Sequence, residues 1–292
     1  MTKRTSTSAR PGGIEEGGTT AALSDSEVRE ADRRTNPRAA IVFETVRREG
    51  QQELERPAVS LAFSGLAAGL SMGFSLVATG VIQAALPPNA PWTPLIANLG
   101  YTLGFLIVVM GRQQLFTENT VTAIVPLLDS RRKWSILGNV VRMWGIVLLT
   151  NLAGAALFAL LVAHTDSFAP TVKAAFLDLG TTTLSYGFTT TLVKGIFAGW
   201  LIALMVWLLP AAENSRLAVV IIITYLVGAA GLSHIIAGSV EGLYAVVEGA
   251  VSLPNYLANF LAPVFVGNCL GGVLLVSILN YAQIAQEGAD AG

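Results

Sequence analysis

Polar residues interrupt a long apolar run at positions 111–120, where the sequence reads GRQQLFTENT. A second apolar run is interrupted at positions 228–238, which read GAAGLSHIIAG. A bilayer core offers no water to an open backbone, so irregular chain at that depth must be buried in protein or line a cavity. Two such breaks, one in each half of the apolar region, predict a substrate pathway built from broken helices. The sequence therefore indicates a membrane channel or transporter.

The composition agrees with a membrane protein. The chain is 53% hydrophobic and 13% charged, with a mean hydropathy of +0.60, whereas soluble domains carry about 25% charged residues. Apolar runs long enough to cross a ~30 Å hydrocarbon core recur along the chain. We expect six spans at residues 57–86, 95–129, 135–163, 184–209, 217–250 and 256–284, with the second and fifth broken. The predicted fold is an all-α membrane domain of six transmembrane helices over residues 57–285.

The two ends of the chain differ from this apolar region. Residues 1–40 are highly charged and poor in large apolar groups, which predicts a disordered tail. Residues 41–56 carry a modest apolar stripe, which predicts an amphipathic helix on the membrane face, and residues 286–292 form a C-terminal tail. Lys and Arg concentrate in the N-terminal arm, at 131–133 and at Arg216, so these segments are expected on the cytoplasmic side. Both termini are predicted to be cytoplasmic, in the inner membrane of a bacterium.

The first break contains charged residues that are costly in hydrocarbon. A charge at the centre of a spanning helix costs ~2.5–3.5 kcal/mol on insertion scales. Arg112 and Glu118 are therefore paired, near an interface, or in a wet vestibule. After the break, residues 120–128 read as a short half-helix whose N-terminus starts around Thr117 to Asn119. Its free N–H groups and positive dipole end favour an anion.

The second break contains His234, set among Gly228, Gly231 and Gly238. An ionisable residue within a span is a functional candidate, and an imidazole exchanges protons near physiological pH. The alternative is a structural histidine whose ring is satisfied by a neighbouring hydroxyl or carbonyl. No metal cluster, nucleophile–base pair or phosphate loop accompanies the two breaks in the sequence. An enzyme with catalytic residues, a metal or a cofactor is therefore not predicted.

Four sequence motifs resemble those of the formate/nitrite transporter family, in the same order and spacing. Residues 115–119, LFTEN, resemble the family's L-F-T-x-N loop, and residues 230–234, AGLSH, resemble its glycine-bounded central-histidine loop. Residues 151–155, NLAGA, resemble the N-x-x-G-A of its third helix. Residues 263–272, PVFVGNCLGG, resemble its last-helix motif, in which a G-N pair is followed by G-G. The resemblance covers residues 57–284.

The resemblance implies both a fold and a site. The fold would be aquaporin-like, with inverted halves of three helices, assembled as a homopentamer in which each protomer has its own pore. The solutes would be small monovalent anions such as formate, nitrite or hydrosulfide. By position, Thr117 corresponds to the loop threonine that hydrogen-bonds the central histidine, His234, and Asn268 corresponds to the last-helix asparagine near it. Phe105 and Val227 fall where the family places apolar constriction residues.

Two positions depart from the family pattern. Gly199 aligns with a fourth-helix asparagine that faces the histidine, and Thr183 aligns with a lysine near the outer mouth. Lys194 lies eleven residues after Thr183, and on a helix it would project from a different face. The residues expected in the loops or vestibule of the pathway are Arg112, Glu118, Asn119 and Lys194.

The leading hypothesis is a selective channel or proton-coupled transporter for a small monovalent anion or its conjugate acid. Dry constrictions make a bare anion expensive to move, whereas a protonated weak acid crosses more cheaply. One alternative is a neutral-solute channel for water or a polyol with the same fold. Another is a non-conducting membrane scaffold, which the departures at Gly199 and Thr183 suggest. The predicted partners are the lipid bilayer, further copies of the chain and a small anion, and not a nucleic acid.

Overall fold

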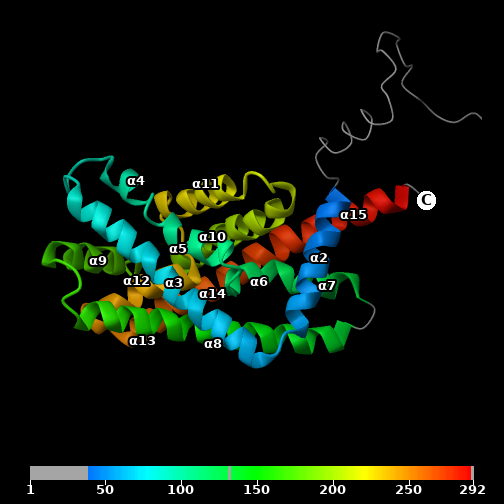
Figure 1. Ribbon diagram of the computed structural model, residues 1–292, viewed down its shortest axis with the longest axis horizontal. Helices are drawn as coiled ribbons and strands as arrows, with labels where there is room; N and C mark the ends of the chain where they lie inside the picture. Colours follow the sequence, from blue (N-terminus) through cyan, green and yellow to red (C-terminus); the bar gives the residue numbers. More distant parts are fainter. Residues whose placement is uncertain (1–38, 131–132, 291–292) are drawn as a thin grey trace, which may run out of the picture. The chain divides into compact units, whose positions relative to one another are not determined.

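The computed structural model describes residues 39–130 and 133–290, and Figure 1 shows how their helices are arranged. Residues 1–38, most of the predicted N-terminal tail, lie outside the described residues. The first helices are α2 (Ala39–Glu55), α3 (Ala58–Ala85), α4 (Thr93–Ala97), α5 (Thr102–Met110), α6 (Phe116–Thr122), α7 (Ile124–Asp129) and α8 (Lys133–His164). They are followed by α9 (Pro170–Thr183), α10 (Phe188–Leu208), a 3-10 turn (Leu209–Ala211), α11 (Arg216–Ala229) and α12 (Ile235–Val247).

The last part of the described chain is a long helical rod. It consists of α13 (Leu253–Asn255), a π-helical segment (Tyr256–Leu261), α14 (Ala262–Leu270), a second π-helical segment (Gly271–Ile278) and α15 (Leu279–Asp290). Pro263, in the first turn of α14, has no N–H and cannot donate to the turn before it, which accounts for the irregular bonding there. The rod continues to Asp290, so helix occupies most of the residues expected to form a C-terminal tail.

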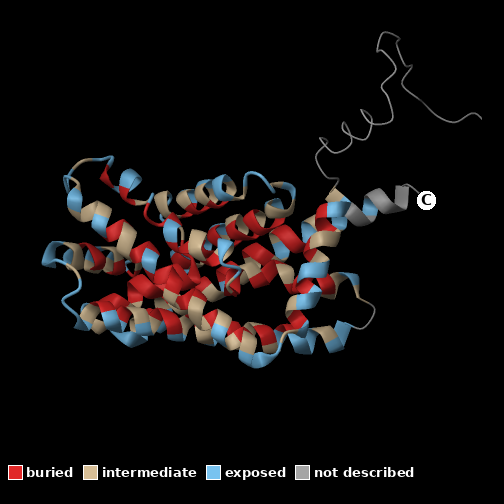
Figure 2. Cartoon of the chain, viewed as in Figure 1, coloured by how far each residue is buried: buried red, intermediate tan, exposed pale blue. Residues whose placement is uncertain are grey.

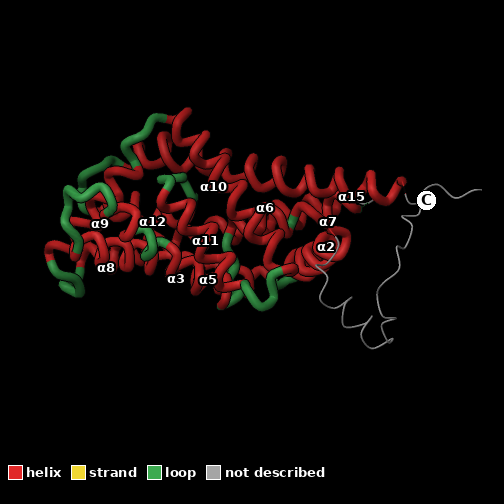
Figure 3. Tube along the Cα trace, turned by 90° about the horizontal axis from the view of Figure 1, so that it is seen from above, coloured by secondary structure: helices red, strands yellow, loops and turns green. Residues whose placement is uncertain are grey.

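Every regular element in the described ranges is a helix, and Figure 3 shows helices joined by loops, without a strand. The prediction of an all-α chain is therefore confirmed for this part of the protein. The helices long and apolar enough to cross a membrane are Ala58–Ala85, Thr93–Met110, Lys133–His164, Phe188–Ala211 and Leu253–Gln283. At the fifth predicted span the chain instead forms two shorter apolar helices, α11 and α12, separated by a loop. At the second predicted span, a loop separates Thr93–Met110 from the short helix α6.

The core forms where the long helices cross, and Figure 2 shows buried residues gathered around α3, α12 and α14. Glycines bring helix backbones into contact there. A Cβ on Gly69 of α3 would lie 2.1 Å from the Asn151 carbonyl oxygen of α8. Likewise, a Cβ on Gly267 of α14 would lie 2.5 Å from the Leu192 carbonyl oxygen of α10. Small residues of this kind stabilise helix pairs in lipid, where hydrophobic attraction between helices is weak.

Large apolar side chains remain exposed on the outward faces of the helices. Examples are Phe63 (71% exposed), Val141 (62%), Leu149 (69%) and Ile222 (64%). A soluble monomer rarely exposes large contiguous apolar surface. These faces suit contact with lipid or with another copy of the chain.

α2 is an amphipathic helix packed on the bundle, close to the range of 41–56 expected from the sequence. Its apolar face belongs to a buried cluster with α6, α7 and α10 that includes Val42, Phe43, Val46, Val121, Val125 and Trp207. Arg142 of α8 donates to the carbonyl oxygens of Leu54 (2.7 Å) and Arg56 (3.1 Å) at the C-terminal end of α2. A cation is favourable at that end, because the helix dipole is negative there.

Candidate functional site

At the first break, α5 ends in a tight cap. The N–H of Gln113 donates to the carbonyl oxygen of Val108 at 3.0 Å. The N–H of Arg112 donates to the carbonyl oxygen of Val109 at 3.2 Å. Arg112 has a φ of 49°, in the left-handed region that few non-glycine residues adopt. These bonds form a Schellman motif, which ends a helix by satisfying its last carbonyls, and α6 begins shortly afterwards at Phe116.

The second break repeats this cap at the end of α11. The N–H of Leu232 donates to the carbonyl oxygen of Val227 at 2.9 Å, and the N–H of Gly231 donates to that of Gly228 at 2.8 Å. Gly231 has a φ of 59°, so it occupies the same left-handed position as Arg112 in the first break. The two breaks therefore share one backbone design, although their side chains differ.

A buried asparagine holds the first break in place. Asn151 of α8 accepts the N–H of Phe116, the first residue of α6, at 2.9 Å. Its amide donates to the carbonyl oxygen of Gln114 in the break at 2.9 Å and to that of Gly65 on α3 at 2.8 Å. One side chain thus joins α8, α3 and the start of α6, and it satisfies the Phe116 N–H and the Gln114 carbonyl oxygen, which have no helical partner.

Asn268 of α14 does the same for the second break. It accepts the N–H of Ile235, the first residue of α12, at 2.9 Å. Its amide donates to the carbonyl oxygen of Ser233 at 3.0 Å and to that of Gly195 on α10 at 2.8 Å. Asn268 is fully buried and lies against backbone, beside the histidine loop. Asn268 therefore fixes the loop that carries His234.

One side-chain contact joins the two breaks. Nε2 of His234 lies 2.7 Å from Oγ1 of Thr117. The ring of Phe105 packs edge-on against the imidazole, with 4.8 Å between the ring centroids. All three side chains are buried, with at most 1% of their surface exposed. The structure therefore brings together three residues that the sequence assigns to the pathway.

The hydrogen bonds of His234 locate its ring proton. Nδ1 of His234 caps α12 and accepts the N–H of Ala237 at 3.2 Å. A backbone N–H is always a donor, so Nδ1 carries no proton in this arrangement. The imidazole is therefore neutral, and its proton lies on Nε2 and is donated to Thr117. The Thr117 hydroxyl keeps its own proton for another acceptor.

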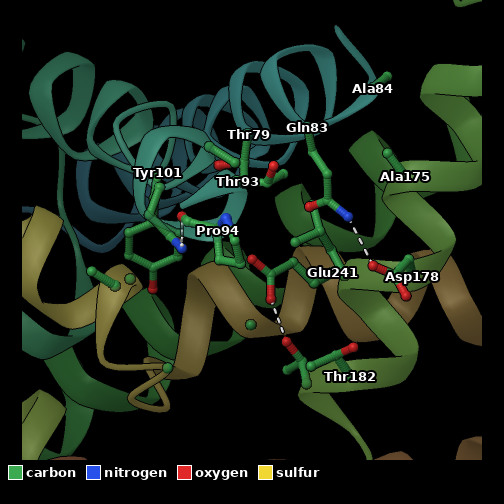
Figure 4. A pocket seen from close by; sticks show the side chains of 18 of the residues that line it. Thr79, Gln83, Ala84, Thr93, Pro94, Tyr101, Ala175, Asp178, Thr182 and Glu241 are labelled. Atoms are coloured by element: carbon green, nitrogen blue, oxygen red, sulfur yellow. Dashed lines mark hydrogen bonds between the residues drawn. The ribbon is translucent and has the colours of Figure 1, made fainter. Parts of the chain in front are cut away.

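His234 forms part of the wall of a cavity of ≈ 870 Å³, termed the His234 chamber. The wall comes from α3, α4, α9, α11, α12 and the second break, and Figure 4 shows many of its side chains. Its titratable residues are Tyr101, Asp178, Tyr186, His234 and Glu241, and no lining residue is Lys or Arg. In the described part of the chain, no group of three or more His, Cys, Asp or Glu could hold a metal ion.

Glu241 is the chamber residue that the sequence reasoning missed. Its side chain is buried in α12, and Oε2 accepts the Thr183 hydroxyl at 2.5 Å. Figure 4 shows the carboxylate directed into the chamber. The sequence does contain a signal for it: Glu241 is the one acidic residue in the apolar segment 235–247. An acidic residue within an apolar span is a functional candidate by default. Thr183, noted from the sequence only as a departure from the family pattern, is the hydrogen-bond partner of Glu241.

A second cavity of ≈ 210 Å³, termed the α2 chamber, lies between α2 and the first break. Arg112, Glu118 and Asn119 line it, so both charged residues of the first break belong to one vestibule. Gln114 donates to the Glu53 carboxylate of α2 at 2.8 Å and accepts from the Asn119 amide at 3.1 Å. These bonds tie the start of α6 to α2.

α5 separates the two chambers. Tyr101, just before α5, lines the His234 chamber, whereas Val109 and Met110 in its last turn line the α2 chamber. Val109 lies eight residues after Tyr101 along the helix, which corresponds to ~12 Å. Phe105 lies midway and is fully buried, as is Val227, and neither lines a chamber. The predicted constriction residues thus lie in closed, apolar parts of the protein.

The two remaining candidates contact backbone. A Cβ on Gly199 would lie 2.4 Å from the Asn268 carbonyl oxygen and 2.5 Å from its Cα, so α10 and α14 leave no room for a side chain there. Lys194 donates from Nζ to the Gly231 carbonyl oxygen at 2.9 Å, and Nζ lies 3.7 Å from the centroid of the Tyr186 ring. Lys194 therefore braces the second break beside the chamber instead of lining it.

Long apolar helices and two matched breaks are typical of one class, the multi-pass α-helical membrane proteins that carry solutes. Within that class the family is shown by sequence. A sequence model described as formate/nitrite transporter matches residues 40–282, and the chain belongs to that family. The resemblance drawn from the four motifs is confirmed.

Individual relatives agree with this assignment. Inner membrane protein YfdC of Escherichia coli is 40% identical over 250 residues, which cover 86% of this chain and 80% of the relative. Formate channel FocB of Escherichia coli is 24% identical over 273 residues, 85% of this chain and 94% of the relative. A solved pentameric formate channel with formate bound has a TM-score of 0.65 at 21% identity and covers 78% of this chain and 98% of that chain. The structural likeness shows a shared fold.

Proposed function

We propose that this protein is a membrane channel or transporter for small monovalent anions or their conjugate acids, with His234 at the centre of the pathway. The contact between His234 and Thr117 carries the proposal, because it joins the two breaks at a buried point. One chamber reaches His234, and the other lies ~12 Å further along α5. The formate channel among the relatives supports the choice of solute class.

The proposed architecture has six spans over residues 57–285, of which the second and fifth are broken. The matched caps and the matched asparagines, Asn151 and Asn268, support two related halves. The pentameric formate channel of the same fold supports a homopentamer. A relative named as an inner membrane protein supports that location, and the Lys and Arg distribution supports cytoplasmic termini.

In this proposal each buried residue has a distinct task. His234 offers a neutral ring whose proton points at Thr117, and the free proton of the Thr117 hydroxyl is available to a passing anion. Phe105 and Val227 keep water out between the chambers, so a charged solute is costly there. Asn268 positions the loop that carries His234. Arg112, Glu118 and Asn119 line the α2 chamber and would contact the solute there, while Lys194 holds the second break beside the His234 chamber.

Replacement of His234 by Asn tests the proposal in proteoliposomes. Uptake of a panel of small weak acids (formate, acetate and nitrite) is measured at two pH values. We expect the variant to lose at least tenfold in rate, or to lose the pH dependence of uptake. His164→Asn is the control, because His164 is exposed and its ring nitrogen only meets the Leu160 carbonyl oxygen of its own helix. If His234→Asn left the uptake of every acid unchanged at both pH values, the pore role of His234 would be wrong.

A further inference from the structure

The His234 chamber carries an excess of negative charge. Its carboxylates belong to Glu241 and Asp178, and none of its lining residues is Lys or Arg. No ion pair in the described part of the chain includes either carboxylate. The imidazole of His234 adds no charge, because its Nδ1 accepts a backbone N–H. The wall of the chamber therefore attracts a cation and repels an anion.

Glu241 is the buried part of this acidic wall. Its residue is only 7% exposed, and Oε2 accepts the Thr183 hydroxyl at 2.5 Å. A carboxylate offers about four acceptor positions, so one hydroxyl leaves most of them open. Figure 4 shows the carboxylate directed into the chamber. Because an ionised carboxylate is costly to bury without a counter-charge, a cation in the chamber would stabilise it.

An unpartnered buried hydroxyl is a second sign of a ligand. Thr79 of α3 lines the chamber and is 1% exposed, and its Oγ1 has no hydrogen-bond partner among the described residues. Buried polar atoms are nearly always hydrogen-bonded, so an orphan of this kind calls for a partner. Figure 4 shows Thr79 and Glu241 on the wall of the same chamber.

The positive end of α12 does not offer the chamber a free anion site. The N–H of Ile235 is accepted by the Asn268 side chain at 2.9 Å, and the N–H of Ala237 is accepted by His234 Nδ1 at 3.2 Å. Protein groups thus already use these N–H donors, which would otherwise bind an anion at a helix N-terminus. Glu241 lies seven residues after His234, about two turns along α12 and ~10 Å away.

The edge of the chamber already holds one ammonium group. Nζ of Lys194 donates to the carbonyl oxygen of Gly231 at 2.9 Å and lies 3.7 Å from the centroid of the Tyr186 ring. Both Gly231 and Tyr186 line the chamber. Carbonyl oxygens and aromatic faces are favourable partners for an ammonium ion. One ammonium offsets at most one of the two carboxylates, so the charge of these surroundings stays negative.

We infer that the His234 chamber is a binding site for a small protonated amine, whose ammonium group donates to the carboxylate of Glu241. Thr79 is a second acceptor for the bound amine or for its water, and the Tyr101 ring adds an aromatic surface to the same wall. A primary amine fits best, because its ammonium group has three N–H donors. The chamber, at ≈ 870 Å³, has room for a short carbon chain on the amine. This ligand class goes beyond the proposed function, which concerns weak acids.

Equilibrium binding of radiolabelled methylammonium to the purified full-length protein in detergent tests the inference. The variants are Glu241→Gln and Thr79→Val, and Glu248→Gln is the control, because Glu248 is exposed and does not line the chamber. Methanol and formate are added as competitors. Methanol matches methylammonium in size without its charge, and formate carries the opposite charge. Gel filtration checks the assembly of every variant.

We expect saturable binding to wild type that neither competitor displaces. The affinity should fall about tenfold or more in Glu241→Gln, which loses a charge-assisted hydrogen bond but keeps the shape of the side chain. It should fall about threefold in Thr79→Val and stay within twofold of wild type in Glu248→Gln. No saturable binding to assembled wild type, equal affinities of wild type and Glu241→Gln, or displacement by methanol would overturn the inference.

Weak-acid uptake by the same preparations is measured separately in proteoliposomes. Weak-acid uptake without amine binding overturns the inference and leaves the proposed function standing. Amine binding without uptake of any weak acid supports the inference and overturns the proposed function.

Discussion

Asn151 and Asn268 make the same three hydrogen bonds, one set in each half of the chain. Each accepts the first N–H of a half-helix, donates to the carbonyl two residues before it, and donates to a glycine carbonyl on a neighbouring long helix. The left-handed residues Arg112 and Gly231 stand at matching positions of the two breaks. The duplicated backbone therefore carries different side chains at its two N-caps, Leu115 in the first half and His234 in the second.

Loss of either asparagine should destabilise the protein strongly. Asn151→Ala leaves the Phe116 N–H and the Gln114 carbonyl oxygen buried without partners. Unsatisfied groups of this kind cost about 1–3 kcal/mol each, so we expect a lower midpoint of thermal unfolding in detergent and a reduced yield of assembled protein. Asn280→Ala is the matched control, since the Asn280 amide makes one bond, to the Val276 carbonyl oxygen four residues earlier in the same helical rod. Equal midpoints for the two variants would contradict the role of Asn151.

The sequence predicted the breaks because their signal is local. Polar residues inside an apolar run show where a spanning helix must open, and the expected half-helix start at Thr117 to Asn119 differs little from the observed Phe116. Family motifs added the contact between Thr117 and His234, although 117 residues separate them. Neither the local pattern nor the family motifs predicted the hydrogen bond between Thr183 and Glu241. The two residues are 58 positions apart, and no short spacing in the sequence relates them. The alignment compared Gly199 with an asparagine, and the structure shows that Gly199 abuts the backbone of Asn268.

The left-handed residues allow a paired test of backbone strain. Arg112 has a φ of 49°, where a Cβ is unfavourable by ~1–2 kcal/mol, so Arg112→Gly should raise stability. Gly231 has a φ of 59°, so Gly231→Ala should lower stability by about 1–2 kcal/mol. A Cβ at Gly231 meets only the Lys194 Nζ at 3.5 Å, an ordinary contact, so the loss is conformational and not steric. Unfolding midpoints that shift in the same direction would contradict this account.

α2 should respond to acid through Glu44. Hydrogen bonds from Arg47 and Arg48 lower the pKa of Glu44 from 4.5 to about 2. Because the folded pKa is lowered, this stabilisation is fully present above pH 4.5 and is lost as the pH falls through 2. The Glu44 side chain is 39% exposed and screened by solvent, so each pair contributes only about 0.5 kcal/mol.

The difference between wild type and Glu44→Gln measures this effect. We expect the variant to unfold at a slightly lower temperature at pH 7, with a gap that shrinks between pH 4.5 and 2 and also shrinks in 1 M salt, where screening is stronger. Glu55→Gln, at the exposed end of the same helix, is the control. A gap that grows on acidification would mean that Glu44 acts in another way.

Gly199 should tolerate no side chain, even a methyl group. In Gly199→Ala the new Cβ would meet the carbonyl oxygen and Cα of Asn268, both backbone atoms that cannot rotate away. Overpacking of this kind costs about 1–3 kcal/mol, and here it also pushes on the residue that positions the His234 loop. We therefore expect both a lower unfolding midpoint and slower weak-acid uptake. Gly138→Ala is the matched control, because a Cβ there meets nothing within 4 Å, and alanine favours a helix by about 1 kcal/mol over glycine. A Gly199→Ala protein as stable and active as Gly138→Ala would show that α10 and α14 can separate without disturbing the site.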